Sequence, residues 1–114
     1  MSQETMIWIA LAAVVATFFF LKRADIGRDK AHALVAGGAQ LVDVRSPAEF
    51  GTGHIDGARN IPLGELDRRV RELGATDRAV IVYCASGTRS AMAKRALHKA
   101  GFTEVYNLGS MRNW

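Results

Sequence analysis

A buried strand that leads into a helix through a short loop is the feature that most constrains this chain. Residues 79–83 (AVIVY) form a continuous apolar run that predicts a strand, and residues 89–100 carry an apolar stripe at helical spacing. Between them lies the loop CASGTRS, residues 84–90, which contains the only cysteine in the 114 residues. A strand followed directly by a helix is the repeating unit of a parallel sheet covered by helices.

The rest of the chain repeats this alternation, so we expect a small α/β domain with a parallel sheet and helices on both faces. Ser46, Pro47 and Glu49 have the spacing of a capping box with proline at the first helical position. The other expected elements are helices at 29–35 and 66–73, strands at 41–44 and 104–108, and an extended piece ending at 60–62.

The N-terminal region differs from the rest, because Thr5 to Leu21 is a run of 17 residues without a charge. We expect a single transmembrane helix here, with residues 1–23 as the anchor and 24–114 as the domain. A cleaved signal peptide fits less well, since no Lys or Arg precedes the run, and a buried core helix would show a polar face. Lys22, Arg23, Arg28 and Lys30 follow the run, so the positive-inside rule predicts a single-pass membrane protein with its domain in the cytoplasm.

The net charge and the single cysteine argue against several classes of function. The net charge of +4 is modest, and basic residues alternate with acids around 67–72, so we expect no nucleic-acid binding. A lone cysteine cannot form an internal disulfide, which fits a reducing compartment. With one cysteine, and with His32, His54 and His98 at no ligand spacing, the sequence predicts no metal site.

Cys84 stands where a reactive thiol is expected. It follows a parallel strand, where ligands bind, and it precedes a helix N-terminus, whose free amides and dipole favour a thiolate. Gly87 lets successive amides converge on one point, Arg89 adds a permanent cation, and Ser86, Thr88 and Ser90 add hydroxyl donors. The loop therefore predicts an activated sulfur nucleophile in an anion-binding cradle, rather than an inert core cysteine.

Other polar residues have weaker indications. Asp43 and Arg45 end a strand, where site residues gather. Asp43 either accepts hydrogen bonds from the cysteine loop or has no role in the site, and Arg45 is expected to pair with Glu49 and brace the 46–50 turn. We expect His54 to be structural, Arg59 to be a solvated surface charge, and Trp114 to pack rather than bind.

Several motifs in order resemble those of single-domain rhodaneses, which are sulfurtransferases. Leu41 to Phe50, then Gly53-His54-Ile55, Gly57-Ala58 and Asn60-Ile61-Pro62, are similar to the family's N-terminal signature. Val82 to Ser90 is similar to its active-site loop, and Gly101-Phe102 with 105–109 and Trp114 to its end. The resemblance covers about residues 26–114 and leaves the apolar N-terminal run outside.

The resemblance implies sulfur transfer through a persulfide on Cys84. Sulfur would come from a donor such as thiosulfate and pass to cyanide or a thiol. The residues 85–89 (Ala85, Ser86, Gly87, Thr88 and Arg89) would bind substrate, with Asp43, Arg45 and Ser90 in support, and no cofactor would be needed. The expected partners are small sulfur-containing anions and thiols, the membrane through residues 5–21, and a membrane protein beside which the anchor would hold the domain.

Two alternatives follow from the same resemblance. Phosphatases and arsenate reductases of this fold have five residues between Cys and Arg, whereas Cys84 and Arg89 are separated by four. The shorter loop fits a sulfur substituent on cysteine better than a tetrahedral oxyanion. The other alternative is a catalytically quiet docking or regulatory module, although such modules usually lose the cysteine, which this chain keeps.

Overall fold

The computed structural model describes residues 2–22 and 24–114, and for residues 18–22 only the helical backbone. A four-stranded sheet forms the centre of the domain, with strand order β2-β1-β3-β4. Every neighbouring pair of strands is parallel, as expected for strands joined by helical crossovers. The described strands are β1 (Gln40–Asp43), β2 (Arg59–Asn60), β3 (Val80–Cys84) and β4 (Val105–Ser110).

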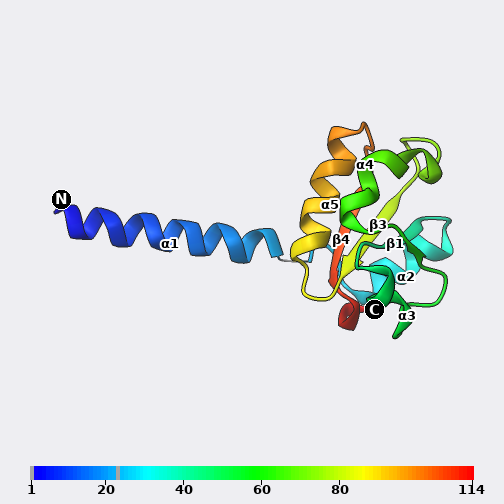
Figure 1. Cartoon of the computed structure of the whole chain (residues 1–114), viewed down its shortest axis with the longest axis horizontal. Helices are drawn as coiled ribbons and strands as arrows, with labels where there is room; N and C mark the ends of the chain where they lie inside the picture. The colour runs from blue at the N-terminus through cyan, green and yellow to red at the C-terminus, as the bar shows by residue number, and fades with distance from the viewer. Residues whose placement is uncertain (1, 23) are drawn as a thin grey trace.

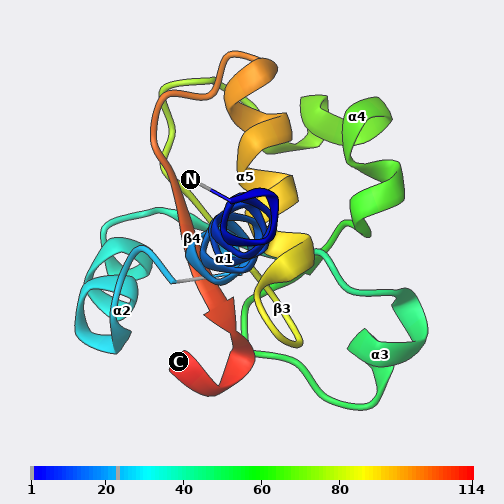
Figure 2. The same cartoon turned by 90° about the vertical axis from the view of Figure 1, so that its left-hand side faces the viewer.

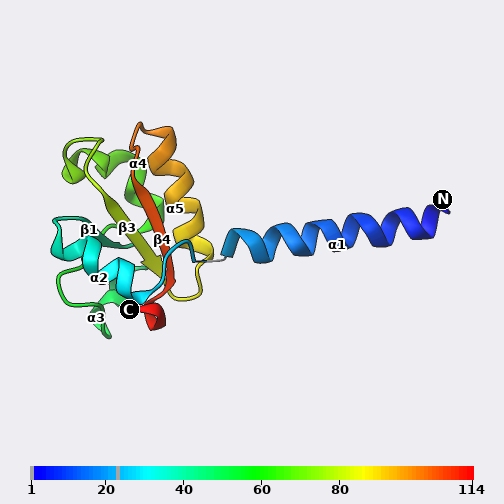
Figure 3. The same ribbon diagram turned by 180° about the vertical axis from the view of Figure 1, so that it is seen from behind.

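Helices cover both faces of this sheet. α4 and α5 lie over one face (Figure 1), and α2 lies over the other (Figure 3). The view along α1 shows the sheet between these two layers (Figure 2). The helices are α1 (Gln3–Lys22), α2 (Arg28–Ala36), α3 (Pro47–Gly51), α4 (Leu66–Arg69) and α5 (Thr88–Lys99), and the short 3-10 turns are η1 (Leu63–Glu65), η2 (Val70–Leu73) and η3 (Met111–Asn113).

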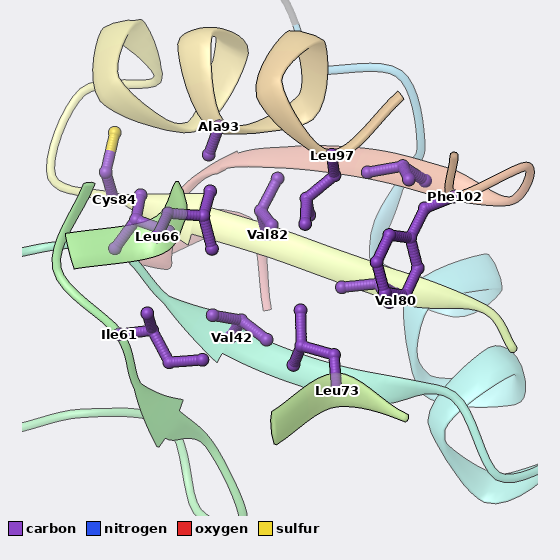
Figure 4. Close-up of a cluster of buried hydrophobic side chains, with 12 residues drawn as sticks. Val42, Ile61, Leu66, Leu73, Val80, Val82, Cys84, Ala93, Leu97 and Phe102 are labelled. Atoms are coloured by element: carbon purple, nitrogen blue, oxygen red, sulfur yellow. The ribbon is translucent and has the colours of Figure 1, made fainter. Parts of the chain in front are cut away.

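The alternation of side chains along β3 divides the core into two clusters. Val80, Val82 and Cys84 face α5, where Leu97 and other apolar residues from α4 and α5 cover them (Figure 4). Ile81 and Tyr83 point to the opposite face, toward α2. All five residues of β3 are buried, because a strand at the centre of a parallel sheet is covered on both sides. Cys84 thus ends the most buried strand and lies on the α5 face.

The expected elements are present, with two local differences. The predicted helix over 66–73 is one short α-helical turn between 3-10 turns, and its apolar residues still reach the core: Leu66 and Leu73 are buried, and Val70 packs against the cluster. On α5, the apolar Met92 lies outside the buried stripe and is 55% exposed. The buried stripe of α5 consists of Ser90, Ala93 and Leu97.

The membrane anchor predicted at residues 5–21 is not supported. α1 does form over Gln3–Lys22 and extends away from the domain (Figure 1). Within residues 2–22 and 24–114, however, no helix has both the length and the hydropathy required to cross a membrane. A crossing takes about 20 mainly apolar residues, and the uncharged run from Thr5 to Leu21 has 17, bounded by Glu4 and Lys22.

Candidate active site

Cys84 lies at the carboxyl end of β3, with the loop 85–87 leading directly into α5. This is the edge at which a parallel sheet binds ligands. The side chain points toward α5 (Figure 4), and the residue has no exposed surface. The strand and the helix therefore fix the position of the sulfur, and the loop forms the cover above it.

Gly87 shapes the loop around the sulfur. Its φ of +99° is in the left-handed region, which is strained for any residue with a Cβ atom. It occupies the N-cap position of α5, where the structure shows no side-chain cap. In this conformation the Gly87 N–H points back at Cys84 and donates to Sγ at 3.0 Å. The conformation of Gly87 thus directs a backbone N–H at the start of α5 toward the thiol.

Ser90 supplies two further contacts to the sulfur. Its backbone N–H donates to Cys84 Sγ at 3.4 Å, and its hydroxyl oxygen lies 3.3 Å from Sγ. The same hydroxyl also lies 3.1 Å from the Gly87 carbonyl oxygen, to which it can donate. Ser90 is fully buried. Ser90, which the sequence predicts as a supporting residue, therefore contacts the sulfur directly.

These contacts lower the pKa of the Cys84 thiol. Burial by itself raises the pKa, because it disfavours the charged thiolate. Hydrogen bonds from the Ser90 hydroxyl and from the Ser90, Gly87 and Ser86 amides act in the other direction and outweigh burial. The net shift is downward from the ordinary value, so the site favours the thiolate, which is the nucleophilic form of cysteine.

Arg89 is held in a bidentate ion pair with Glu49 of α3. Its Nη1 and Nη2 donate to the two carboxylate oxygens at 2.6 and 3.0 Å. The guanidinium lowers the pKa of Glu49 to about 2, with the backbone N–H of Ser46 as the next contributor. Glu49 also closes the predicted capping box with Ser46, which is confirmed. Sequence reasoning gave Glu49 the capping box and a pairing with Arg45, and missed its ion pair with Arg89 beside the cysteine loop.

The expected Arg45–Glu49 pair is wrong. Arg45 instead turns back to Asp43, whose carboxylate accepts from Arg45 Nε at 3.0 Å and from Nη2 at 2.7 Å. The Arg45 backbone N–H also donates to Asp43, at 2.9 Å. Asp43 is fully buried and Arg45 nearly so, and hydrogen bonding to Asp43 raises the arginine pKa. A buried carboxylate needs a close cation, and Arg45 is two residues away, whereas Glu49 remains partly exposed.

Asp43 and Arg45 therefore brace the carboxyl end of β1, which lies next to β3. The hydrogen bonds described for the Asp43 carboxylate come from Arg45, rather than from the cysteine loop. Arg45 Nη2 also donates to the Gly53 carbonyl at 2.7 Å, which ties the loop after α3 to β1. Asn60 Nδ2 donates to the carbonyl oxygens of Asp43 and Arg45, at 3.0 and 2.9 Å. Asn60 is a second residue whose contribution sequence reasoning missed.

The remaining candidates in the cysteine loop differ in exposure. Ala85 and Ser86 are exposed, and Thr88 is half-buried at the start of α5.

The candidates outside the loop make local contacts. His54 stacks on Phe50 at 3.6 Å and its Nδ1 lies 2.9 Å from the Phe50 carbonyl oxygen, which agrees with a structural role. Arg59 is exposed and donates to the Glu72 carbonyl, and Trp114 stacks on His32. Over the ranges that the structure describes, no group of three His, Cys, Asp or Glu side chains is placed to hold a metal ion.

Comparison with known proteins agrees with this geometry. The family model of the rhodanese-like domain matches residues 28–114. The uncharacterized protein YqhL of Bacillus subtilis is 52% identical over 77 residues, which are 67% of this chain and 60% of YqhL, so the match spans less than two thirds of that relative. The thiosulfate sulfurtransferase GlpE of Stutzerimonas stutzeri is 37% identical over 87 residues, covering 75% of this chain and 79% of GlpE.

Among solved structures, the human single-domain sulfurtransferase TSTD1 superimposes with a TM-score of 0.72 at 27% identity, and the match covers 81% of this chain and 95% of TSTD1. Three findings point to the same family. They are the α/β fold with its parallel sheet, the Cys84 loop, and the match of the family model over most of the chain. This chain belongs to the rhodanese-like domain family.

Proposed function

We propose that this protein is a sulfurtransferase that carries sulfur as a persulfide on Cys84. The observation on which the proposal depends is the set of donors around the sulfur: Gly87 and Ser90 place two amides and a hydroxyl within 3.0–3.4 Å of Sγ. Relatives that are named as thiosulfate sulfurtransferases support the same reaction class. The thiolate is the nucleophilic form of cysteine, and hydrogen bonds of this kind make it easier to form.

In the first half-reaction the Cys84 thiolate attacks the outer sulfur of a donor such as thiosulfate. The new bond joins Sγ to that sulfur, and the S–S bond of thiosulfate breaks with its electron pair leaving on sulfite. The persulfide that remains on Cys84 is an anion when deprotonated, and the loop amides that now hold the thiolate are placed to stabilise it.

In the second half-reaction a nucleophilic acceptor attacks the terminal sulfur. Cyanide or a thiolate takes that sulfur, and the electron pair of the broken S–S bond returns to Cys84 Sγ. Hydrogen bonds from Ser90 and Gly87 stabilise this leaving thiolate, and a lower thiol pKa makes a better leaving group. The cysteine carries the transferred atom itself, so the two half-reactions alternate and give ping-pong kinetics.

Access to the sulfur requires movement of the loop. Cys84 has no exposed surface, whereas Ala85 and Ser86 directly after it are exposed. A donor therefore meets residues 85–86 first, and the loop must open before the outer sulfur of the donor reaches Sγ. We propose that the loop residues 85–89 form the substrate-binding surface once it has opened.

Steady-state kinetics with thiosulfate and cyanide test the proposal. The full chain should form thiocyanate with parallel double-reciprocal lines, and Cys84→Ser should form none. Thiocyanate formation by Cys84→Ser, or its absence from the folded wild-type protein, would refute the persulfide mechanism. The second of these results would favour a docking or regulatory module.

We also propose that α1 holds the protein at a membrane with its domain on the cytoplasmic side. Several large apolar side chains of α1 are more than half exposed, including Trp8 at 71% and Val14 at 67%. Such a surface is unusual for a helix in water and favours contact with lipid or a membrane protein partner. In cell fractionation, the full chain should sediment with membranes and residues 24–114 should not. If both forms stay in the supernatant, the membrane proposal fails.

A further inference from the structure

The Arg89–Glu49 pair has a consequence for the charge of the substrate. Arg89 is the cation of the cysteine loop, and both of its terminal nitrogens donate to Glu49. Its side chain is 36% exposed and that of Glu49 is 37% exposed, so both groups border the surface through which a substrate must approach. An incoming anion finds this arginine already paired.

A second arginine, Arg45, is also paired with a carboxylate. At the carboxyl end of β1, the buried Arg45 is paired with the buried Asp43. Arg89 interacts electrostatically with Glu49, Cys84 and Asp43, and Arg45 with Asp43, Tyr83 and Glu49. The two arginines and two carboxylates have a net charge of zero. A thiolate at Cys84 adds one negative charge to these four groups.

We infer that Glu49 is a specificity-determining residue, which neutralises Arg89 and so directs the site toward sulfur donors that carry little negative charge. A dianion such as thiosulfate must either displace Glu49 from Arg89 or bind near the thiolate without a direct ion pair to Arg89. A monoanionic or neutral sulfane donor avoids most of this cost, because Coulomb energy scales with the charge of each partner. This inference depends on the sulfurtransferase function proposed above.

Glu49 is held in place by α3 as well as by Arg89. Its backbone N–H donates to Ser46 Oγ at 3.2 Å, and its Oε1 accepts from the Ser46 backbone N–H at 3.2 Å. The carboxylate is therefore directed at the loop before a substrate arrives, and it acts on the reaction through Arg89. Ser46 offers a matched control, because Ser46→Ala removes the N-cap oxygen and leaves both charges of the ion pair.

Two donors that differ mainly in charge provide the test. Methanethiosulfonate resembles thiosulfate in shape, but a methyl group replaces one charged oxygen. With the full chain, we expect wild type to have a higher kcat/KM for methanethiosulfonate than for thiosulfate. Glu49→Gln should raise the ratio of kcat/KM for thiosulfate to that for methanethiosulfonate about fivefold or more, since it frees one unit of positive charge. Ser46→Ala should leave this ratio at the wild-type value.

An activity-free measurement separates this inference from the proposed function. Titration of the isotope-labelled full chain with sulfate and with methanesulfonate, followed by the amide NMR signals of residues 84–90, reports anion binding directly. Glu49→Gln should bind sulfate several-fold more tightly and gain clearly less affinity for methanesulfonate, because the Coulomb energy scales with the charge of the anion. An unchanged preference in Glu49→Gln, or the same change in Ser46→Ala, would overturn the inference. Failure of sulfur transfer with both donors would overturn the proposed function, while the titration still decides the role of Glu49.

Discussion

Replacing Ser90 by alanine should raise the pKa of the Cys84 thiol. The substitution removes the hydroxyl that lies 3.3 Å from Sγ and keeps the Ser90 backbone N–H, which donates to the same sulfur. The Gly87 carbonyl oxygen also loses the hydroxyl as a donor, but it still accepts from the Ala91 N–H at 3.1 Å. The change therefore acts mainly on the thiolate and leaves no carbonyl without a partner.

The size of the shift follows from one charge-assisted hydrogen bond. Such a bond contributes about 1.5–3 kcal/mol, and one pKa unit corresponds to about 1.4 kcal/mol, which together give one to two units. The single hydroxyl proton of Ser90 is shared between Sγ and the Gly87 carbonyl. We therefore expect the lower end of this range, an upward shift of about one unit.

Ultraviolet absorbance of the thiolate measures this pKa without interference from other thiols, because Cys84 is the only cysteine. The titration compares wild type with Ser90→Ala, and Cys84→Ser supplies the blank. Ser86→Ala is the matched control, since it removes an exposed hydroxyl from the same loop and keeps the Ser86 amide. An unchanged pKa in Ser90→Ala, or an equal rise in Ser86→Ala, would refute the role assigned to the Ser90 hydroxyl.

Four further results are expected, each measured by urea unfolding of the full chain. Gly87→Ala should destabilise the protein by about 1–2 kcal/mol, because alanine is strained at a φ of +99°; no loss would show that the loop relaxes. Leu97→Ala should cost about 2–5 kcal/mol, since Leu97 is fully buried in the core; a cost well below this range would contradict that packing. Arg45→Ala should cost about 3–5 kcal/mol, because it leaves the carboxylate of Asp43 buried without its cation; an equal cost for an exposed control such as Arg95→Ala would contradict this reason. Because the pKa of Glu49 falls from 4.5 to about 2 on folding, its stabilising contribution is fully present above pH 4.5 and is lost as the pH falls toward 2. Wild type should therefore exceed Glu49→Gln in stability at neutral pH, and this difference should shrink at pH 3; a difference independent of pH would refute the ion-pair explanation.

Much of the fold could be predicted because local signals agree with the tertiary structure. The apolar run at 79–83 corresponds to β3, and the Ser46–Glu49 capping box begins α3 as expected. The region 66–73 was less predictable. Its apolar spacing identified the buried Leu66 and Leu73, but spacing of this kind does not distinguish one α-helical turn between 3-10 turns from a continuous helix.

The site was predictable where it is local in sequence, and less so where it depends on tertiary contacts. Cys84, Gly87 and Ser90 lie within seven residues, and the geometry of a strand-to-helix turn brings them together. Glu49 contacts Arg89, which is 40 residues away in the sequence. The capping box already accounted for a glutamate at this position, so nothing in the sequence pointed to the contact with Arg89. The mistaken pairing of Arg45 with Glu49 followed from their closeness in sequence. Arg45 pairs with Asp43 because Asp43 is buried, and only the folded structure shows that burial.

Intact mass spectrometry of the full chain after treatment with thiosulfate tests the central claim most directly. The account predicts that wild type gains the mass of one sulfur atom, that Cys84→Ser gains none, and that cyanide removes the added sulfur. An adduct on Cys84→Ser, or a folded wild-type protein that gains no sulfur, would contradict Cys84 as the sulfur carrier.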